Sequence, residues 1–111
     1  IFILNRQHFK YNNLNMTQLI NIKKSDAKGK KYTATFKDIN GTKKTIHFGA
    51  VGYDDYTIGA TKEQRDNYRA RHSKDPINKP MTAGALSYYV LWGDSKNINT
   101  NIKKYKKRFN V

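Results

Sequence analysis

Alternating apolar and polar residues in the first half of the chain predict a β-hairpin. KYTATFK (31–37) and KTIHFG (44–49) flank the sequence DINGT, and an Asn-Gly pair between such segments is a strong hairpin signal. A two-residue Asn40-Gly41 turn sets apolar residues against polar ones, whereas a three-residue loop over 40–42 gathers one apolar face. We therefore expect the longer loop, with the pairs Phe36–Ile46, Ala34–Phe48 and Tyr32–Ala50, and with His47 on the opposite face beside Thr35.

Three later segments carry the signals of helices. Thr61 and Gln64 form a capping-box pattern, which predicts a helix from about Lys62 to His72. In MTAGALSYYVLWG, the most hydrophobic segment, Thr82 is the expected N-cap and Gly93 the expected C-terminal stop. The last segment predicts a helix with one apolar stripe, made of Ile98, Ile102, Tyr105 and Phe109.

These elements predict a small α+β domain over residues 16–111, in which a β-hairpin or small antiparallel sheet packs against two or three helices. A chain of 111 residues fits one domain, because a second core could not bury enough apolar surface. TQLINI (17–22) is a candidate further strand, and residues 1–15 are expected to be an N-terminal appendage or an extra strand. The apolar hairpin face is expected to meet Leu86, Tyr89, Val90, Ile98, Ile102 and Phe109, with Trp92 closing one end.

The amino-acid composition gives the chain a strong positive charge. Twenty-two Lys and Arg against eight Asp and Glu give a formal net charge of +14, which attracts phosphates or acidic surfaces. The alternative is an AT-rich genome that inflates Lys, Asn and Ile. There is no cysteine, so disulfides and thiolate metal sites are excluded. No apolar stretch approaches the roughly 20 residues of a membrane span, and the initial IFIL is too short for a signal peptide, so we predict no span and no secretion.

The predicted helix at 62–72 carries a basic stripe. Lys62, Arg65, Arg69 and His72 fall on one face, a pattern that suits a phosphate backbone. Arg71 is a further candidate cation of the same helix. The alternative interpretation is a solvated helix with internal pairs such as Glu63–Asn67 or Asp66–Arg69.

The last helix carries a second set of cations opposite its apolar stripe: Lys103, Lys104, Lys106, Lys107 and Arg108. They suit nucleic acid or an acidic protein better than a membrane surface, since the core requires the apolar face that a membrane would bind. Tyr68 and Tyr105, interleaved with cations, are candidates to stack on unpaired bases. Both tyrosines also fit the edge of a core.

The segment HFGAVGYDDYT (47–57) raises the question of a catalytic or metal site. Adjacent Asp54 and Asp55 point to opposite sides of a strand, which disfavours a metal site. Glycine and aspartate fit a turn whose carboxylates cap backbone amides. A nuclease-like site with His47 or His72 as the base beside an arginine is less favoured, because no spacing is diagnostic. We predict no catalytic residue, no metal ligand and no cofactor.

The order of several motifs resembles a known family. KKYTATF, TIHFGAVGYDDYT, RDNYRARH, PMTAGALSYYVLWG and IKKYKKRF together resemble small uncharacterised basic proteins of nucleocytoplasmic large DNA viruses such as algal viruses, grouped as a domain of unknown function. The likeness spans about residues 16–110. It implies a compact basic virion or host-interaction protein without a known catalytic role. Where the resemblance leads us to expect a bulky aromatic after TAG, this chain has Ala85 and Leu86.

Charge and resemblance together favour a non-enzymatic viral protein that binds the DNA or RNA phosphate backbone without sequence specificity. The alternative is a minor capsid or other virion structural protein that contacts acidic protein surfaces. A small nuclease is less favoured. We expect the protein in the virion or in the interior of the infected host cell.

Overall fold

Three antiparallel strands form one sheet in the order β1-β2-β3. The computed structural model describes residues 17–111, so the predicted appendage or strand at 1–15 lies outside the described residues. The strands are β1 (Gln18–Lys24), β2 (Lys30–Lys37) and β3 (Lys43–Ala50). The candidate strand at 17–22 is therefore confirmed as β1, an edge strand beside the central strand β2.

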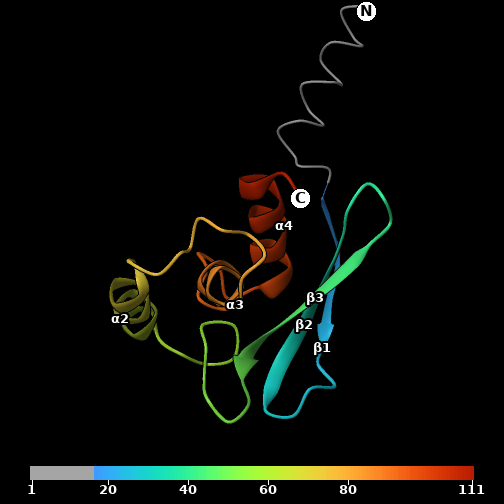
Figure 1. Cartoon of the computed structure of the whole chain (residues 1–111). Helices are drawn as coiled ribbons and strands as arrows, with labels where there is room; N and C mark the ends of the chain where they lie inside the picture. Colours follow the sequence, from blue (N-terminus) through green and yellow to red (C-terminus); the bar gives the residue numbers. More distant parts are fainter. Residues whose placement is uncertain (1–16) are drawn as a thin grey trace, which may run out of the picture.

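The second half of the chain is helical and confirms the α+β class (Figure 1). Its elements are α2 (Lys62–His72), α3 (Ala83–Leu86), the single-turn π-helix η1 (Ser87–Leu91) and α4 (Ile98–Phe109). In Figure 1, α3 and α4 lie beside the sheet, and α2 lies on their far side from it. None of the helices within residues 17–111 has the length and apolar character to cross a membrane.

Local signals set the starts of these helices, at Thr61 and Thr82 as predicted and at Asn97, which was not predicted. The Thr61 side chain accepts from the backbone of Gln64, and the Gln64 side chain accepts from the backbone N–H of Thr61, which completes the capping box of α2. Thr82 caps α3 through the backbone N–H of Ala85. Asn97 caps α4 in the same way.

The predicted hairpin register is wrong by two residues. Tyr32 pairs with Phe48, Ala34 with Ile46 and Phe36 with Lys44, so the turn spans 38–42. The cause is Asp38: its Oδ1 accepts from the backbone N–H of Asn40 and of Thr42, both at 2.9 Å, and its own N–H donates to the Thr42 carbonyl. Gly41, at φ 86°, supplies the left-handed conformation that this turn needs.

The shift of two residues leaves every side chain on its predicted face, because strand faces alternate with period two. His47 does lie on the outer face, but it pairs with Thr33 and not beside Thr35. The Thr33 hydroxyl lies 2.7 Å from His47 Nδ1 and donates to Ser25 Oγ at 2.8 Å.

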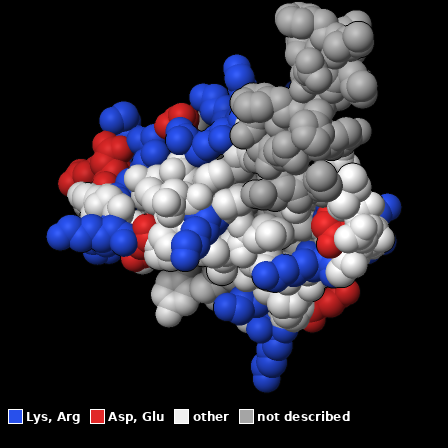
Figure 2. Space-filling view, turned by 45° about the horizontal axis from the view of Figure 1, so that its top comes forward, with Lys and Arg blue, Asp and Glu red and all other residues white. Residues whose placement is uncertain are grey.

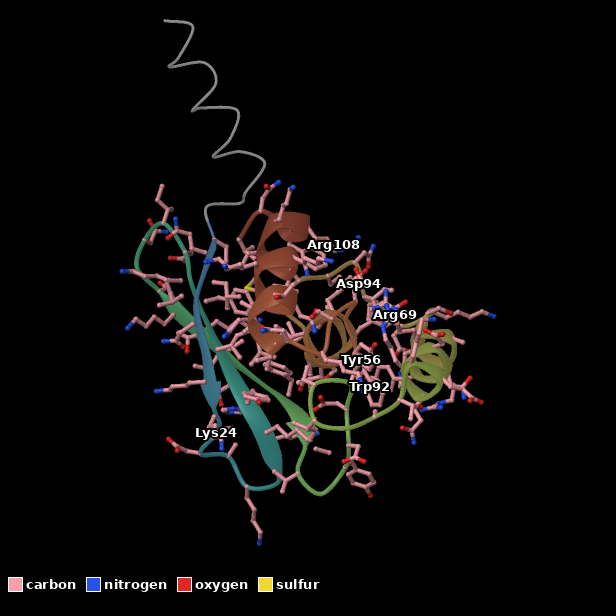
Figure 3. The ribbon with its side chains drawn as sticks, turned by 180° about the vertical axis from the view of Figure 1, so that it is seen from behind. Lys24, Tyr56, Arg69, Trp92, Asp94 and Arg108 are labelled. Carbon is pink, nitrogen blue, oxygen red and sulfur yellow. The ribbon has the colours of Figure 1, made fainter. Side chains whose placement is uncertain are left out.

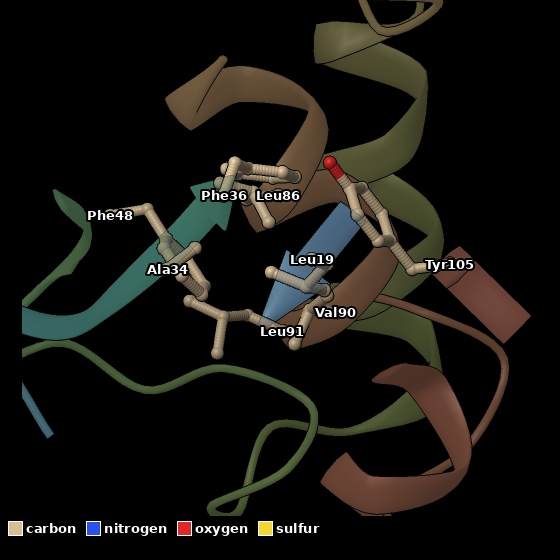
Figure 4. Packing of buried hydrophobic residues seen from close by; sticks show 8 residues of the cluster. All are labelled: Leu19, Ala34, Phe36, Phe48, Leu86, Val90, Leu91 and Tyr105. Carbon is tan, nitrogen blue, oxygen red and sulfur yellow. The ribbon is translucent and has the colours of Figure 1, made fainter. Parts of the chain in front are cut away.

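The core lies between the inner face of the sheet and the helices α3, η1 and α4 (Figure 4). Its buried members are Leu19, Ala34, Phe36, Phe48, Leu86, Val90, Leu91 and Tyr105. The apolar stripe of α4 packs here as predicted, with Ile98, Ile102 and Phe109 partly buried around Tyr105. The predicted core missed Leu19 and Leu91, and Trp92 is partly buried at its edge.

Close packing of α4 against the end of η1 requires two particular residues. A Cβ on Gly93 would lie 2.2 Å from the Tyr89 carbonyl oxygen and 2.8 Å from Asn101 Cγ, so only glycine fits. Asn101 is 1% exposed. Its Nδ2 donates to the carbonyls of Val90 and Ser95, at 2.9 and 2.7 Å, and its Oδ1 accepts from the Ser95 N–H at 3.0 Å.

Asn101→Ala is expected to lower the free energy of unfolding by about 3 kcal/mol, because it leaves buried backbone groups without partners. Urea denaturation followed by the fluorescence of the single tryptophan, Trp92, measures this. Asn99→Ala is the matched control on the exposed side of α4, where a change within about 0.5 kcal/mol is expected. Equal denaturation midpoints for the two variants would contradict the structural role of Asn101.

Candidate anion-binding surface

Arg65 of α2 binds the chain just after η1. Its Nε donates to the Gly93 carbonyl at 2.7 Å, and its Nη2 donates to Asp94 Oδ1 at 2.8 Å. Its Nη1 donates to Asp66 Oδ1, also at 2.8 Å. Only 14% of the Arg65 side chain is exposed. These bonds occupy the guanidinium, so Arg65 is not available as the phosphate-binding residue that the sequence pattern predicts.

Arg69, one turn later on α2, binds η1 itself. Its Nη1 donates to the Trp92 carbonyl at 2.8 Å and more weakly to the Tyr88 carbonyl at 3.5 Å. The guanidinium carbon lies 4.3 Å from the centre of the Tyr88 ring, which adds a cation–π contact. Arg69 is half-buried. It therefore has a structural role, although the sequence pattern predicts that it contacts phosphate.

The remaining predicted cations of α2 also have partners, although that of Arg71 is only a ring. Lys62 pairs with Asp66 at 3.1 Å, and His72 Nδ1 lies 2.7 Å from Asp75. Arg71 is exposed, with its guanidinium carbon 5.9 Å from the Tyr68 ring centre. Two of the four residues of the expected stripe, Arg65 and Arg69, thus bind the protein itself, whereas Lys62 stays 76% exposed. Asp66 pairs with Lys62 and Arg65 and not with Arg69.

The two candidate stacking residues both have intramolecular contacts. Tyr105 is fully buried and its hydroxyl donates to the Pro80 carbonyl, so the prediction that it stacks on bases is wrong. Burial also raises the pKa of Tyr105. Tyr68 stacks on Trp92, with 4.5 Å between ring centres and 9° between planes, and on His72 at 4.2 Å. Since α2 has no fully buried residue, this stack and the two arginines attach it to the rest of the protein.

The cations of α4, in contrast, are exposed. Lys103, Lys106 and Lys107 form no ion pair with any residue of the described range 17–111. Lys104 lies 3.5 Å from Asp94, with both side chains more than half exposed, so this pair adds little stability. Arg108 lies over the Tyr89 ring, 4.6 Å from its centre. The structure thus leaves most of the charge of α4 available to an external anion.

A pocket of about 470 Å³ lies between α4, the end of η1 and α2. Figure 3 shows Arg108, Asp94 and Arg69 along this side of the molecule. The charged residues that line this pocket are four cations, Arg69, Lys104, Lys107 and Arg108, and a single carboxylate, Asp94. Tyr89 and Asn101 are among its uncharged lining residues. The lining therefore carries a formal charge of +3, four positive charges less one negative. It brings one cation of α2 together with three of α4.

Asp94 is the internal counter-ion of this pocket. Partial burial raises the pKa of Asp94, but the attraction of Lys104, Arg69 and Arg65 exceeds this effect and holds it below the usual value. The carboxylate therefore stays charged at neutral pH and competes with any incoming anion for the same cations.

Residues 47–50 are the end of β3, and residues 51–57 form a structured connector, as the composition of the segment predicts. Asp55 is 1% exposed; its Oδ1 accepts from the backbone N–H and the hydroxyl of Thr57, and its Oδ2 pairs with Lys31 Nζ at 2.7 Å. Within residues 17–111 the side chains form no cluster of three His, Asp or Glu that could hold a metal ion. Tyr53 of this segment is 73% exposed, and the sequence pattern did not predict it as a binding residue.

Comparisons with known proteins place this architecture in a family. The family of unknown function DUF5754 matches residues 20–72, which run from β1 to the end of α2. The uncharacterized protein L851 of Acanthamoeba polyphaga mimivirus is 36% identical over 80 residues, which cover 66% of this chain and 80% of that protein. No solved structure matches the chain. The mimivirus relative confirms the predicted relationship to proteins of unknown function from large DNA viruses.

The lowered pKa of Asp94 predicts a pH dependence of stability. A carboxyl whose folded pKa is depressed contributes stability above its unfolded pKa of about 3.9, and this contribution is lost as the pH falls through the lower folded value. Asp94→Asn is therefore expected to be less stable than wild type at pH 7, and the difference is expected to disappear in strong acid. Urea denaturation of both proteins over a pH series measures it. High salt is the control, since screening shrinks the difference. A difference that persists unchanged in strong acid would refute this role of the charge.

Proposed function

The chain belongs to the DUF5754 family of proteins of unknown function, and we propose that it binds the phosphate backbone of DNA or RNA, without base specificity and without catalysis. The observation that carries the proposal is the pocket beside α4, where four cations face one carboxylate. Phosphate oxygens are the anions that lysine and arginine side chains bind most readily in nucleic acids.

The exposed face of α4 extends this pocket along the helix. Apolar side chains at 98, 102, 105 and 109 turn one side of α4 toward the core and leave the lysines on the other sides. A twelve-residue helix is about 18 Å long, a length over which a nucleic-acid strand presents several phosphates. Several cations of one rigid element can therefore engage neighbouring phosphates together.

The chemistry of these side chains supports backbone contact and not base reading. Lysine is a flexible point charge, and the arginine side chains of this surface already bind rings and carbonyls of the protein. Base readout needs side chains that are held for bidentate contact with base edges. The proposed interaction is therefore of low specificity and strongly dependent on salt.

A second candidate is a structural role in the virion, through contacts with acidic protein surfaces. It is supported by the spread of Lys and Arg over several parts of the face in Figure 2. Specific protein contacts depend less on salt than binding to phosphates does. Either function implies a location where viral genomes and virion proteins meet, in the virion or inside the infected cell.

Replacement of the free lysines of α4 is expected to weaken nucleic-acid binding and flatten its salt dependence. In fluorescence anisotropy with labelled duplex DNA and single-stranded RNA, we expect a wild-type log-log salt slope of about −4 or steeper. Lys103→Gln/Lys106→Gln/Lys107→Gln is expected to reduce this slope by about 1 for each phosphate that the variant no longer neutralises.

The matched control removes the same charge from the hairpin: Lys37→Gln/Lys43→Gln/Lys44→Gln, all three exposed. It is expected to retain a slope close to that of the wild type. An equal loss in both triple variants would show that binding depends on total charge and not on α4. Absence of binding at low salt would refute the nucleic-acid proposal and leave the virion structural role.

Asp94→Asn is expected to tighten nucleic-acid binding about threefold at low salt, although it destabilises the fold, because it frees the pocket cations from their internal carboxylate. Anisotropy under conditions where the variant is fully folded measures the change. Asp26→Asn, which alters the net charge equally at an exposed site between β1 and β2, is the control. Similar affinity in the two variants would mean that phosphates do not enter the pocket.

A further inference from the structure

The loop between β3 and α2, residues 51–61, displays apolar side chains that the core does not use. Val51 is 60% exposed, Tyr53 73% and Ile58 54%. All three line one hollow of about 610 Å³ at the end of the sheet where the β1–β2 turn lies. Exposed apolar side chains that gather in a single place are typical of interaction surfaces, whereas scattered ones need no explanation.

This loop is held in place by buried polar contacts. The Asp55–Lys31 pair lies at its base, with side chains 2% and 12% exposed, and Lys31 Nζ also donates to the Tyr53 carbonyl. The backbone N–H of Val51 donates to Gly29, and that of Tyr56 donates to Leu91. The apolar side chains are thus presented by an ordered scaffold, which lowers the entropy that a partner must overcome.

The charged side chains around the hollow indicate the charge of the partner that it favours. Lys31 and Asp55 neutralise each other, so the remaining charged side chains of the lining are Lys24, Lys30 and Asp54. Both lysines are exposed and lie at strand ends on either side of the β1–β2 turn. An anionic group is therefore favoured beside the apolar side chains. The net charge of +14 further disfavours basic partners.

We propose that this hollow docks an acidic peptide segment of another protein, with an aliphatic or aromatic side chain inserted among Val51, Tyr53 and Ile58 and with carboxylates beside Lys24 and Lys30. Two of the three apolar residues are aliphatic and offer no face for base stacking. A protein segment therefore fits better than a single-stranded nucleic acid.

The docking surface is separate from the basic pocket beside α4. Lys24 lies at the opposite side of the molecule from Arg69, Asp94 and Arg108 in Figure 3. The two linings share no residue. The inference therefore does not require nucleic-acid binding by α4, and it adds to the second candidate function both a place and an apolar anchor.

The test is selection of short random peptides displayed on phage against the full chain, followed by anisotropy with the selected peptides as labelled synthetic probes. We expect selected peptides to combine Asp or Glu with aliphatic or aromatic residues. Their dissociation constants are expected to rise at least about tenfold with Val51→Ser/Tyr53→Ser/Ile58→Ser and several-fold with Lys24→Gln/Lys30→Gln.

Two controls separate the possible outcomes. Ile39→Ser removes an apolar side chain that is 58% exposed at the β2–β3 turn, outside the hollow, and is expected to leave peptide binding unchanged. The triple serine variant is expected to unfold at the wild-type urea concentration and to bind DNA as wild type does. The proposal is overturned if no acidic, apolar peptides are selected, or if those peptides bind the triple variant equally well. It is also overturned if that variant loses oligonucleotide binding in place of peptide binding.

Discussion

The helical half of this protein depends on hydrogen bonds to the carbonyl groups at and just after the end of η1. A helix end leaves carbonyls without partners, and their burial is unfavourable unless other donors reach them. Here two other helices supply those donors. Asn101 of α4 binds the Val90 carbonyl, and the arginines of α2 bind the carbonyls of Trp92 and Gly93. One short helix end therefore fixes two neighbouring helices, of which α2 has no buried apolar side chain of its own.

This arrangement divides the positive charge of the chain into two classes. Arg65 and Arg69 are held by backbone oxygens and rings, so their charge serves the fold first. The lysines of α4 lie on a helix that is already anchored by its apolar stripe, and their charge is not needed for packing. The net charge of +14 thus overstates what an external anion meets, and the position of the cations matters more than their number.

Signals contained within a few residues were read correctly from the sequence. The capping box at Thr61 and the apolar stripe of α4 are local patterns, and both elements form where predicted. The hairpin register was wrong because the pattern of faces is identical in two registers that differ by two residues, and the side chain of Asp38 selects between them. The basic stripe of α2 was misread because the partners of Arg65 and Arg69 lie about 20 to 30 positions further along the chain. No periodicity within a helix distinguishes an arginine that faces solvent from one that faces a distant carbonyl.

On the other side of the molecule the buried Asp55–Lys31 pair also uses charge to hold the fold. A buried ion pair is weak evidence for stability, because desolvation offsets most of its attraction. Its value here lies in geometry: Lys31 of the central strand binds both the Asp55 carboxylate and the Tyr53 carbonyl, and so ties the β3–α2 loop to the sheet. A loop whose only task was to connect β3 to α2 would need neither a buried charge pair nor three exposed apolar side chains. The combination of a rigid base with an apolar tip is the arrangement expected of a recognition loop on a stable scaffold.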